Sequence, residues 1–200
     1  MRLTVIDYKA GNLASVLKAL RYLGAEPVVT DADVSLIERA ERIVLPGVGH
    51  FAATQRLDVS GLTTAIRSAI GRGVPFLGIC VGMQWLYAGS SEAPGQRGLG
   101  HFAESCARFP DGEDKVPHVG WNSLTVKSGS RLLAGIEDEH VYFTHSYRAP
   151  VTADTAATTL YIEPFSAAVE RGNVMGVQFH PEKSGEAGLK ILRNFLEWAC

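Results

Sequence analysis

Pro75-Phe76-Leu77-Gly78-Ile79-Cys80-Val81-Gly82-Met83-Gln84 joins an apolar run to a turn framed by two glycines. Residues 75–79 are nearly all apolar, which predicts a buried strand, and the turn opens an apolar helix. The pattern at the turn is G-x-C-x-G, the thiol counterpart of the nucleophile elbow G-x-S-x-G. Such a sharp turn needs small neighbours so that the central side chain stands clear of the backbone. Cys80 is therefore predicted to be a nucleophile at a helix N-terminus, where the dipole favours a thiolate.

The same alternation of strand and helix runs through the first half of the chain. Short apolar strands are predicted at residues 3–6, 27–29, 42–45 and 75–79. Helical spacing of apolar residues predicts helices at 12–23, 31–39 and 62–70, and Gly24 closes the first of them. Apolar strands that alternate with helices indicate a parallel sheet covered on both faces.

The second half places strand-like stretches close together. They lie at about 116–126, 140–148, 156–162, 166–171 and 174–179, with the hairpin signal Gly172-Asn173 between the last two. A final helix from Ser184 carries Leu189, Leu192, Phe195 and Leu196 on one face. We expect one α/β domain over residues 1–200, with a parallel or mixed central sheet, helices on both faces and an antiparallel extension.

Composition limits the classes of function. The 200 residues carry 19 Lys and Arg against 21 Asp and Glu, so there is no basic excess to bind nucleic acid or a membrane surface. The three cysteines, Cys80, Cys106 and Cys200, are far apart, which predicts a reducing compartment rather than a disulfide framework. No apolar segment resembles a signal peptide or a membrane span, so a cytoplasmic protein is expected. The spacing of histidines and cysteines predicts no metal site.

A cysteine nucleophile requires a base, and His180 is the best candidate of the six histidines. It stands directly after the apolar residues 174–179, and Glu182 follows two positions later. Side chains two apart in an extended segment project to the same side, so Glu182 can accept a hydrogen bond from the imidazole. Taken alone, the pattern is equally typical of a turn histidine beside a solvated glutamate, and a lone cysteine is often a small core residue.

A second glycine-framed turn, Pro46-Gly47-Val48-Gly49, also follows a predicted strand. The N–H groups of Gly47 and Val48, together with that of Val81, are predicted to stabilise an oxyanion, where losing one donor typically costs about 10²–10³ in rate. Residues 47–52 also match the dinucleotide fingerprint G-x-G-x-x-A. That alternative is disfavoured because the motif follows the third strand and no acid stands about 20 residues further on.

Together these motifs resemble those of the class I, or triad, glutamine amidotransferases. The family's marks are a G-x-C-x-G-x-Q elbow, a P-G-x-G strand end and F-H-P-E, found here at residues 78–84, 46–49 and 179–182. Four further segments resemble the glutaminase subunits of imidazole glycerol phosphate synthases, which serve histidine biosynthesis. They lie at residues 6–13, 115–122, 142–147 and 176–184, and Pro117-His118-Val119-Gly120-Trp121-Asn122 is the most specific of them.

The resemblance implies the flavodoxin-like α/β fold of the family and a chemistry without cofactor. Cys80 would attack the carboxamide of glutamine, His180 would pass a proton to the departing ammonia, and Glu182 would hold the histidine. The residues implied to bind glutamine are Gly49, Gln84, His145, Ser146 and Tyr147.

The resemblance also implies a partner, a (β/α)₈-barrel cyclase subunit that receives the ammonia in a heterodimer. Two hundred residues leave no length for such a barrel in this chain. The positions that match the family's interface are Asn12, Trp121, Tyr142 and Lys183, although a tryptophan among apolar neighbours is more often a core residue.

Other functions are compatible with parts of the pattern. The alternatives are a regulatory module that no longer uses its thiol, a hydrolase of another amide or γ-glutamyl bond, and an amidotransferase subunit for another pathway such as anthranilate synthesis. The sequence departs from the family at Lys9, where glycine is common, and at Val81, where leucine is usual.

Overall fold

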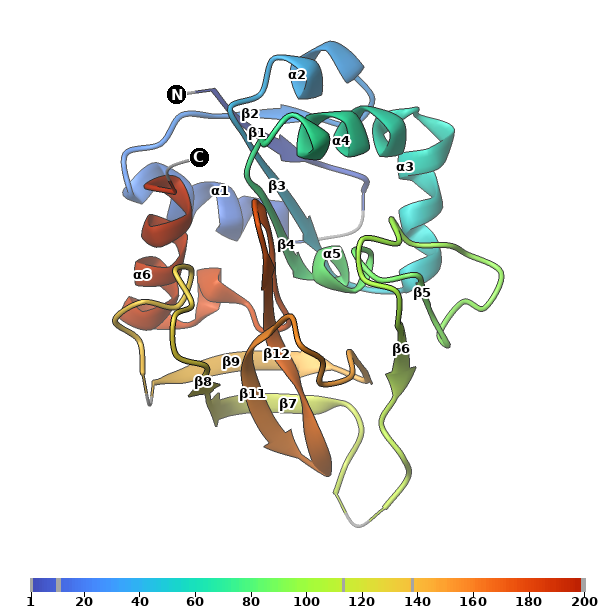
Figure 1. Cartoon of the computed structure of the whole chain (residues 1–200), viewed down its shortest axis with the longest axis vertical. Coiled ribbons are helices and arrows are strands. Elements are labelled where there is room, and N and C mark those ends of the chain that lie inside the picture. Colours follow the sequence, from blue (N-terminus) through green and yellow to red (C-terminus); the bar gives the residue numbers. More distant parts are fainter. Residues whose placement is uncertain (1, 10–11, 113, 138, 199–200) are drawn as a thin grey trace.

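A computed structural model describes residues 2–9, 12–112, 114–137 and 139–198. Cys200, as well as Ala10 and Gly11 of the segment at residues 6–13, lie outside these ranges. The centre of the molecule is an eight-stranded mixed sheet in the order β2-β1-β3-β4-β13-β12-β11-β8 (Figure 1). The α/β prediction is therefore confirmed.

Five neighbouring strands of this sheet run parallel. They are β2 (Pro27–Thr30), β1 (Leu3–Ile6), β3 (Arg42–Gly47), β4 (Phe76–Cys80) and β13 (Val174–Val177). Every residue of β1, β4 and β13 is buried, which explains why these strands are apolar throughout rather than alternating.

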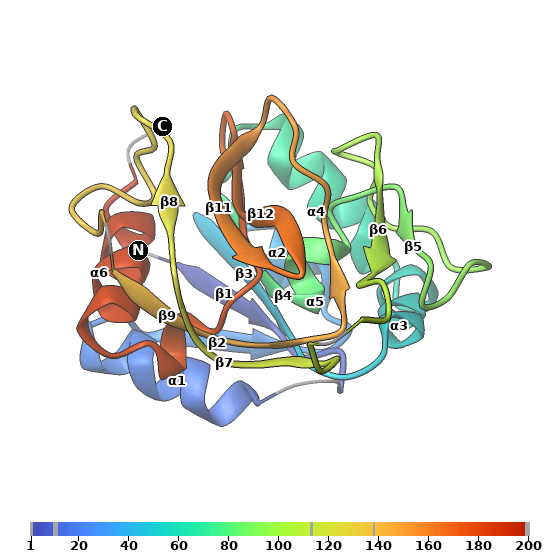
Figure 2. The same cartoon turned by 90° about the horizontal axis from the view of Figure 1, so that it is seen from below.

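Helices cover both faces of the parallel strands, with α1 and α6 on one face and α2 to α4 on the other (Figures 1 and 2). Their bounds are α1 (Leu13–Tyr22), α2 (Val34–Glu38), α3 (Gln55–Val59), α4 (Leu62–Gly71), α5 (Val81–Gln84) and α6 (Gly185–Leu196). The short elements that were not predicted include the 3₁₀ helix η1 (Phe51–Thr54) and α3. The helix α5 that follows Cys80 has only 4 residues, shorter than its apolar run indicates.

The antiparallel extension consists of β12 (Glu163–Arg171), β11 (Thr155–Tyr161) and β8 (Thr125–Val126). Gly172, with φ of 60°, lies in the turn between β12 and β13, as the hairpin signal predicts.

Two stretches that were each predicted as one strand are divided between sheets. Residues 116–126 hold β7 (His118–Ser123) and β8, because β7 pairs with β9 while β8 pairs with β11. Residues 140–148 hold β9 (His140–His145) and β10 (Tyr147–Arg148), and β10 joins the short strands β6 (Ser105–Arg108) and β5 (Gly89–Ser90). No helix among the described residues is long and apolar enough to cross a bilayer.

Candidate active site

The three sequence motifs meet at the carboxyl ends of neighbouring parallel strands. Cys80 ends β4, and Gly47, at the end of β3, is its partner in register. On the other side of β4, Val177 of β13 pairs with Ile79, and the chain leaves β13 toward His180. Ligands of open α/β sheets bind at this edge, so the topology brings the predicted nucleophile, base and oxyanion loop to one place.

Cys80 has a left-handed backbone conformation, with φ of 54°. A non-glycine residue in this region is strained and persists only where its surroundings enforce it. The flanking glycines do so by allowing close approach. A Cβ on Gly78 would lie 2.4 Å from the carbonyl oxygen of Gly82, and a Cβ on Gly82 would lie 1.9 Å from that of Leu45. The G-x-C-x-G pattern is thus a steric requirement of the turn.

His180 and Glu182 form a hydrogen bond of 2.8 Å between Nδ1 and Oε1. Both side chains are almost fully buried. Glu182 lies in the 3₁₀ turn η2 (Pro181–Lys183), so the expectation of one extended segment is wrong, although the two side chains still meet. Burial opposes a charge on His180, but the Cys80 thiol and the Glu182 carboxylate outweigh it and raise the pKa of His180 to about 10.

A cavity of about 220 Å³ opens beside the Cys80 thiol. All five residues that the resemblance implies for glutamine binding line it, namely Gly49, Gln84, His145, Ser146 and Tyr147. Val81 lines it too, whereas Gly47 and Val48 are not among its lining residues. Gly47 lies instead beneath the hydroxyl of Tyr8, which a Cβ at that position would meet at 2.0 Å.

Sequence reasoning missed three residues of the cavity wall, Glu92, Pro117 and Thr144. Glu92 is the only carboxylate among the lining residues, and its Oε2 accepts a hydrogen bond of 2.7 Å from the N–H of Phe51. No local sequence pattern predicts Glu92 as a site residue, because it lies in a loop that is brought to the cavity by long-range contacts.

Comparison with known proteins decides the family. The family described as "Glutamine amidotransferase class-I" matches residues 4–198. The chain belongs to the class-I glutamine amidotransferases. It is 46% identical over 196 residues to imidazole glycerol phosphate synthase subunit HisH of Methanothermobacter thermautotrophicus, with 98% of each protein covered. The protein of the same name from Geobacillus kaustophilus is 47% identical over 200 residues, covering 96% of this chain and 94% of that one.

Two solved structures share the fold of this chain. A crystal structure of a glutamine amidotransferase superposes with a TM-score of 0.78 at 20% identity and covers 98% of both chains. The structure of PurLQS from Thermotoga maritima gives 0.76 at 23% identity, covering 98% of this chain and 97% of that chain.

Two side chains of this amidotransferase cavity are held by internal hydrogen bonds. Both ring nitrogens of His145 are engaged, Nδ1 with the carbonyl oxygen of Tyr147 at 2.8 Å and Nε2 with His118 Nδ1 at 3.2 Å. Its ring is therefore placed to hold the cavity wall rather than to bind a ligand. Gln84 donates through Nε2, and its buried Oε1 has no partner among the described residues.

Three of the four residues that match the interface positions form one exposed cluster. Trp121 is 57% exposed, and its ring packs edge-on against that of Tyr142 with 6.1 Å between the ring centres. Lys183 Nζ lies 5.6 Å from the Tyr142 ring centre. The alternative of a core tryptophan is thus wrong. Asn12 lies before α1 and donates to Ser15 Oγ at 2.8 Å.

The departure at Lys9 has a backbone explanation. Lys9 has φ of 62°, the conformation that glycine adopts without strain, which accounts for the family's usual glycine. Its N–H donates to Asp7 Oδ1 at 2.9 Å, and its Nζ pairs with Asp7 and Asp31. Val81 contributes a backbone N–H whatever its side chain, so this second departure leaves the turn unchanged.

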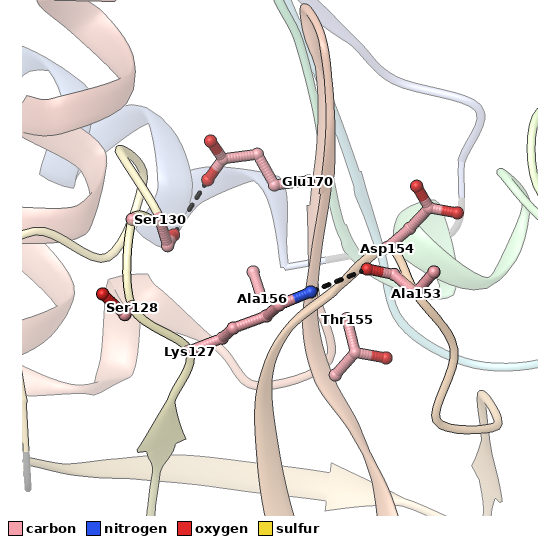
Figure 3. Close-up of a pocket in the computed structure, with 9 residues that line it drawn as sticks. Lys127, Ser128, Ser130, Ala153, Asp154, Thr155, Ala156 and Glu170 are labelled. Carbon is pink, nitrogen blue, oxygen red and sulfur yellow. Dashed lines mark hydrogen bonds between the residues drawn. The ribbon is translucent and has the colours of Figure 1, made fainter.

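A separate hollow of about 160 Å³ lies between the loop after β8 and strands β11 and β12. Figure 3 draws the residues that line it. Its charged groups are satisfied internally, since Lys127 Nζ donates to the Ala153 carbonyl oxygen and Ser130 Oγ donates to Glu170. It contains none of the predicted site residues. The described residues hold no group of three or more His, Cys, Asp or Glu side chains placed to bind a metal ion.

Proposed function

We propose that this chain hydrolyses glutamine to glutamate and ammonia through a cysteinyl thioester, and that Cys80, His180 and Glu182 carry the reaction. The observation that carries the proposal is the strained Cys80 turn at the same sheet edge as the buried His180–Glu182 pair, beside a cavity lined by polar groups. Thiol nucleophile, base and orienting carboxylate are the groups that amide cleavage needs.

The first half of the reaction forms the thioester. Cys80 attacks the carboxamide carbon of glutamine as a thiolate paired with protonated His180, and the tetrahedral intermediate collapses with loss of the C–N bond. His180, charged at neutral pH because its pKa is raised, gives a proton to the departing nitrogen, which leaves as ammonia. Water, deprotonated by the now neutral His180, then attacks the thioester carbon, which releases glutamate and restores the Cys80 thiolate beside protonated His180.

Polar groups of the cavity suit the two ends of glutamine. Glu92 presents a carboxylate to the cavity and can pair with the α-ammonium group, and the polar residues Gln84 and Ser146 line the same cavity. The backbone N–H groups of Val81, Val48 and Gly47 would stabilise the oxyanion. Gly49 of the same loop lines the cavity, and Gly47 and Val48 directly precede it in the chain.

We further propose that the ammonia passes to a separate (β/α)₈-barrel cyclase subunit that makes imidazole glycerol phosphate and an aminoimidazole carboxamide ribonucleotide. Sequence identities of 46% and 45%, over 98% and 100% of this chain, to proteins called imidazole glycerol phosphate synthase subunit HisH support this pathway. The exposed cluster of Trp121, Tyr142 and Lys183 supports a docking surface there, since exposed aromatic residues often anchor protein interfaces.

The test is the rate of glutamate formation, measured with and without the cyclase and its ligand. We expect turnover to rise strongly when both are present and to disappear in Cys80→Ala. Equal turnover in Cys80→Ala and wild type would refute the triad. Failure to bind the cyclase, together with binding to another synthase, would leave the glutaminase chemistry standing and remove the pathway.

A further inference from the structure

A series of buried polar side chains leads from the Cys80 sulfur to strand β7. We propose that Gln178 is a further catalytic residue whose amide N–H holds the Cys80 sulfur, and that Gln84, His145 and His118 are positioning residues that fix the direction of that amide. This inference rests on the proposed function, because it concerns the same thiol. Its starting observation is that Gln178 Nε2 lies 3.6 Å from Cys80 Sγ.

The carbonyl oxygen of Tyr147 fixes the orientation of both amides. A carbonyl only accepts, so the Gln84 atom 3.0 Å from it must be the donor Nε2. The other N–H of that group points to Gln178 Oε1, also at 3.0 Å. Gln178 therefore accepts from Gln84 and must present its own N–H groups on the opposite side, where one of them faces the sulfur.

The same carbonyl orders a second branch through two histidines. His145 Nδ1 donates to it, which leaves His145 Nε2 as the acceptor for the N–H of His118 Nδ1. His118 Nε2 is then an acceptor, and Asn122 Nδ2 on β7 lies 3.4 Å from it. A proton added to either ring would set two N–H groups against each other, and burial lowers the pKa of His118 to about 4 and that of His145 to about 3.

Burial makes this arrangement effective. Gln178 is fully buried, and Gln84, His118 and His145 are at most 6% exposed, so water does not compete for their hydrogen bonds. The Gln178 amide meets the sulfur beside His180, whose imidazole also pairs with Cys80 and has its pKa raised by that contact. The amide and the base thus hold the sulfur together, and the amide N–H stabilises its thiolate form.

The decisive measurement is the pH dependence of Cys80 alkylation by iodoacetamide in the full chain, without glutamine, followed by mass spectrometry of the Cys80 peptide. Gln178→Met preserves length and removes the donor. We expect its alkylation midpoint to move upward by about one pH unit, the effect of losing a hydrogen bond to an ionised group. Following the Cys80 peptide separates the signal from Cys106, whose pKa is raised by burial.

Ser166→Ala is the matched control. Ser166 is a fully buried polar residue on β12 whose hydroxyl bonds Thr155 and the Pro150 carbonyl oxygen, with no bond to the network. It should lower stability and leave the Cys80 midpoint unchanged. An unchanged midpoint in folded Gln178→Met, or an equal shift in Ser166→Ala, would overturn the proposal.

A second variant keeps the test open if Gln178→Met does not fold. Gln84→Met leaves the Gln178 amide in place but removes the donor that directs it, so we expect a smaller upward shift of the midpoint. No shift would count against the inference. Alkylation needs no turnover, so the two proposals can fail separately. If glutaminase activity depends on Cys80 but the alkylation midpoint of Gln178→Met is unshifted, only this inference is removed. If turnover survives in Cys80→Ala, the proposed function itself is removed.

Discussion

The ends of β4 and β13 lie side by side, yet the chain holds them in place by different means. The turn after β4 is held by packing, because Gly78 and Gly82 let backbone atoms approach too closely for any side chain. The turn after β13 is held by hydrogen bonds. The His180 N–H donates to the Tyr142 carbonyl oxygen at 2.9 Å, and Ser184 Oγ donates to the His180 carbonyl oxygen at 2.7 Å.

This difference matches what each end must do. A nucleophile has to project from one fixed direction, and steric exclusion enforces that direction at any pH. A proton-transferring histidine has to change charge during the reaction, and hydrogen-bond partners such as Glu182 respond to that charge. Mutations that add atoms to the turn after β4 should therefore lower stability through steric overlap. The stability contributed by the buried, hydrogen-bonded histidines should instead depend on pH.

The largest effect should come from Gly82→Ala. Its Cβ would lie 1.9 Å from a backbone oxygen of Leu45, which cannot rotate away as a side chain can. We expect a loss of about 3 kcal/mol in the free energy of unfolding, measured by urea denaturation. Gly71→Ala is the matched control, because a Cβ there meets nothing within 4 Å and the residue ends α4. A similar loss in both variants would contradict the steric account.

The same division explains what the sequence could predict. The packing-held turn is local, so the spacing of Gly78, Cys80 and Gly82 was sufficient to predict it. Gln178 and Glu92 escaped prediction because their partners, Cys80 and Phe51, are distant in sequence and meet only in the fold. His145 is predicted to bind glutamine, but the bond of its Nε2 to His118 depends on the pairing of β7 with β9, which the sequence does not specify.

Parallel strands were likewise easier to predict than the strands that change partner. The runs in β1, β3 and β4 are apolar because both faces are covered. Residues 116–126 looked like one strand because nothing local marks the point at which pairing passes from β9 to β11. The boundary between sheets is a property of long-range contacts.

The hydrogen-bonded part should show the stronger pH dependence. His118 has its folded pKa lowered to about 4 from an unfolded value near 6.5, so the unfolded chain binds an extra proton between these values. Its contribution to stability is complete above about pH 6.5 and is lost as the pH falls toward 4. His118→Phe keeps a ring against Tyr161 and Phe143 and should reduce the slope of unfolding free energy against pH by at most about 1.4 kcal/mol per pH unit.

Urea denaturation at several values between pH 5 and pH 6 measures that slope. Exposed carboxylates titrate in the same way in both proteins, so the difference between wild type and His118→Phe isolates the imidazole. Identical slopes would mean that the unfolding equilibrium does not sense the His118 proton, and would contradict the pH dependence expected of the buried histidine pair.

The smallest effect should come from Lys9, whose strained backbone conformation is not held in place by close packing. Like Cys80 it has a positive φ, but ion pairs with Asp7 and Asp31 at the surface surround it instead of close-packed backbone. Lys9→Ala and Lys9→Gly remove the same ion pairs and differ in backbone strain. We expect the folded-to-unfolded ratio of Lys9→Gly to exceed that of Lys9→Ala by about fivefold in urea denaturation. Equal stability would show that this loop relaxes its φ, which the glycine-framed turn at Cys80 has no room to do.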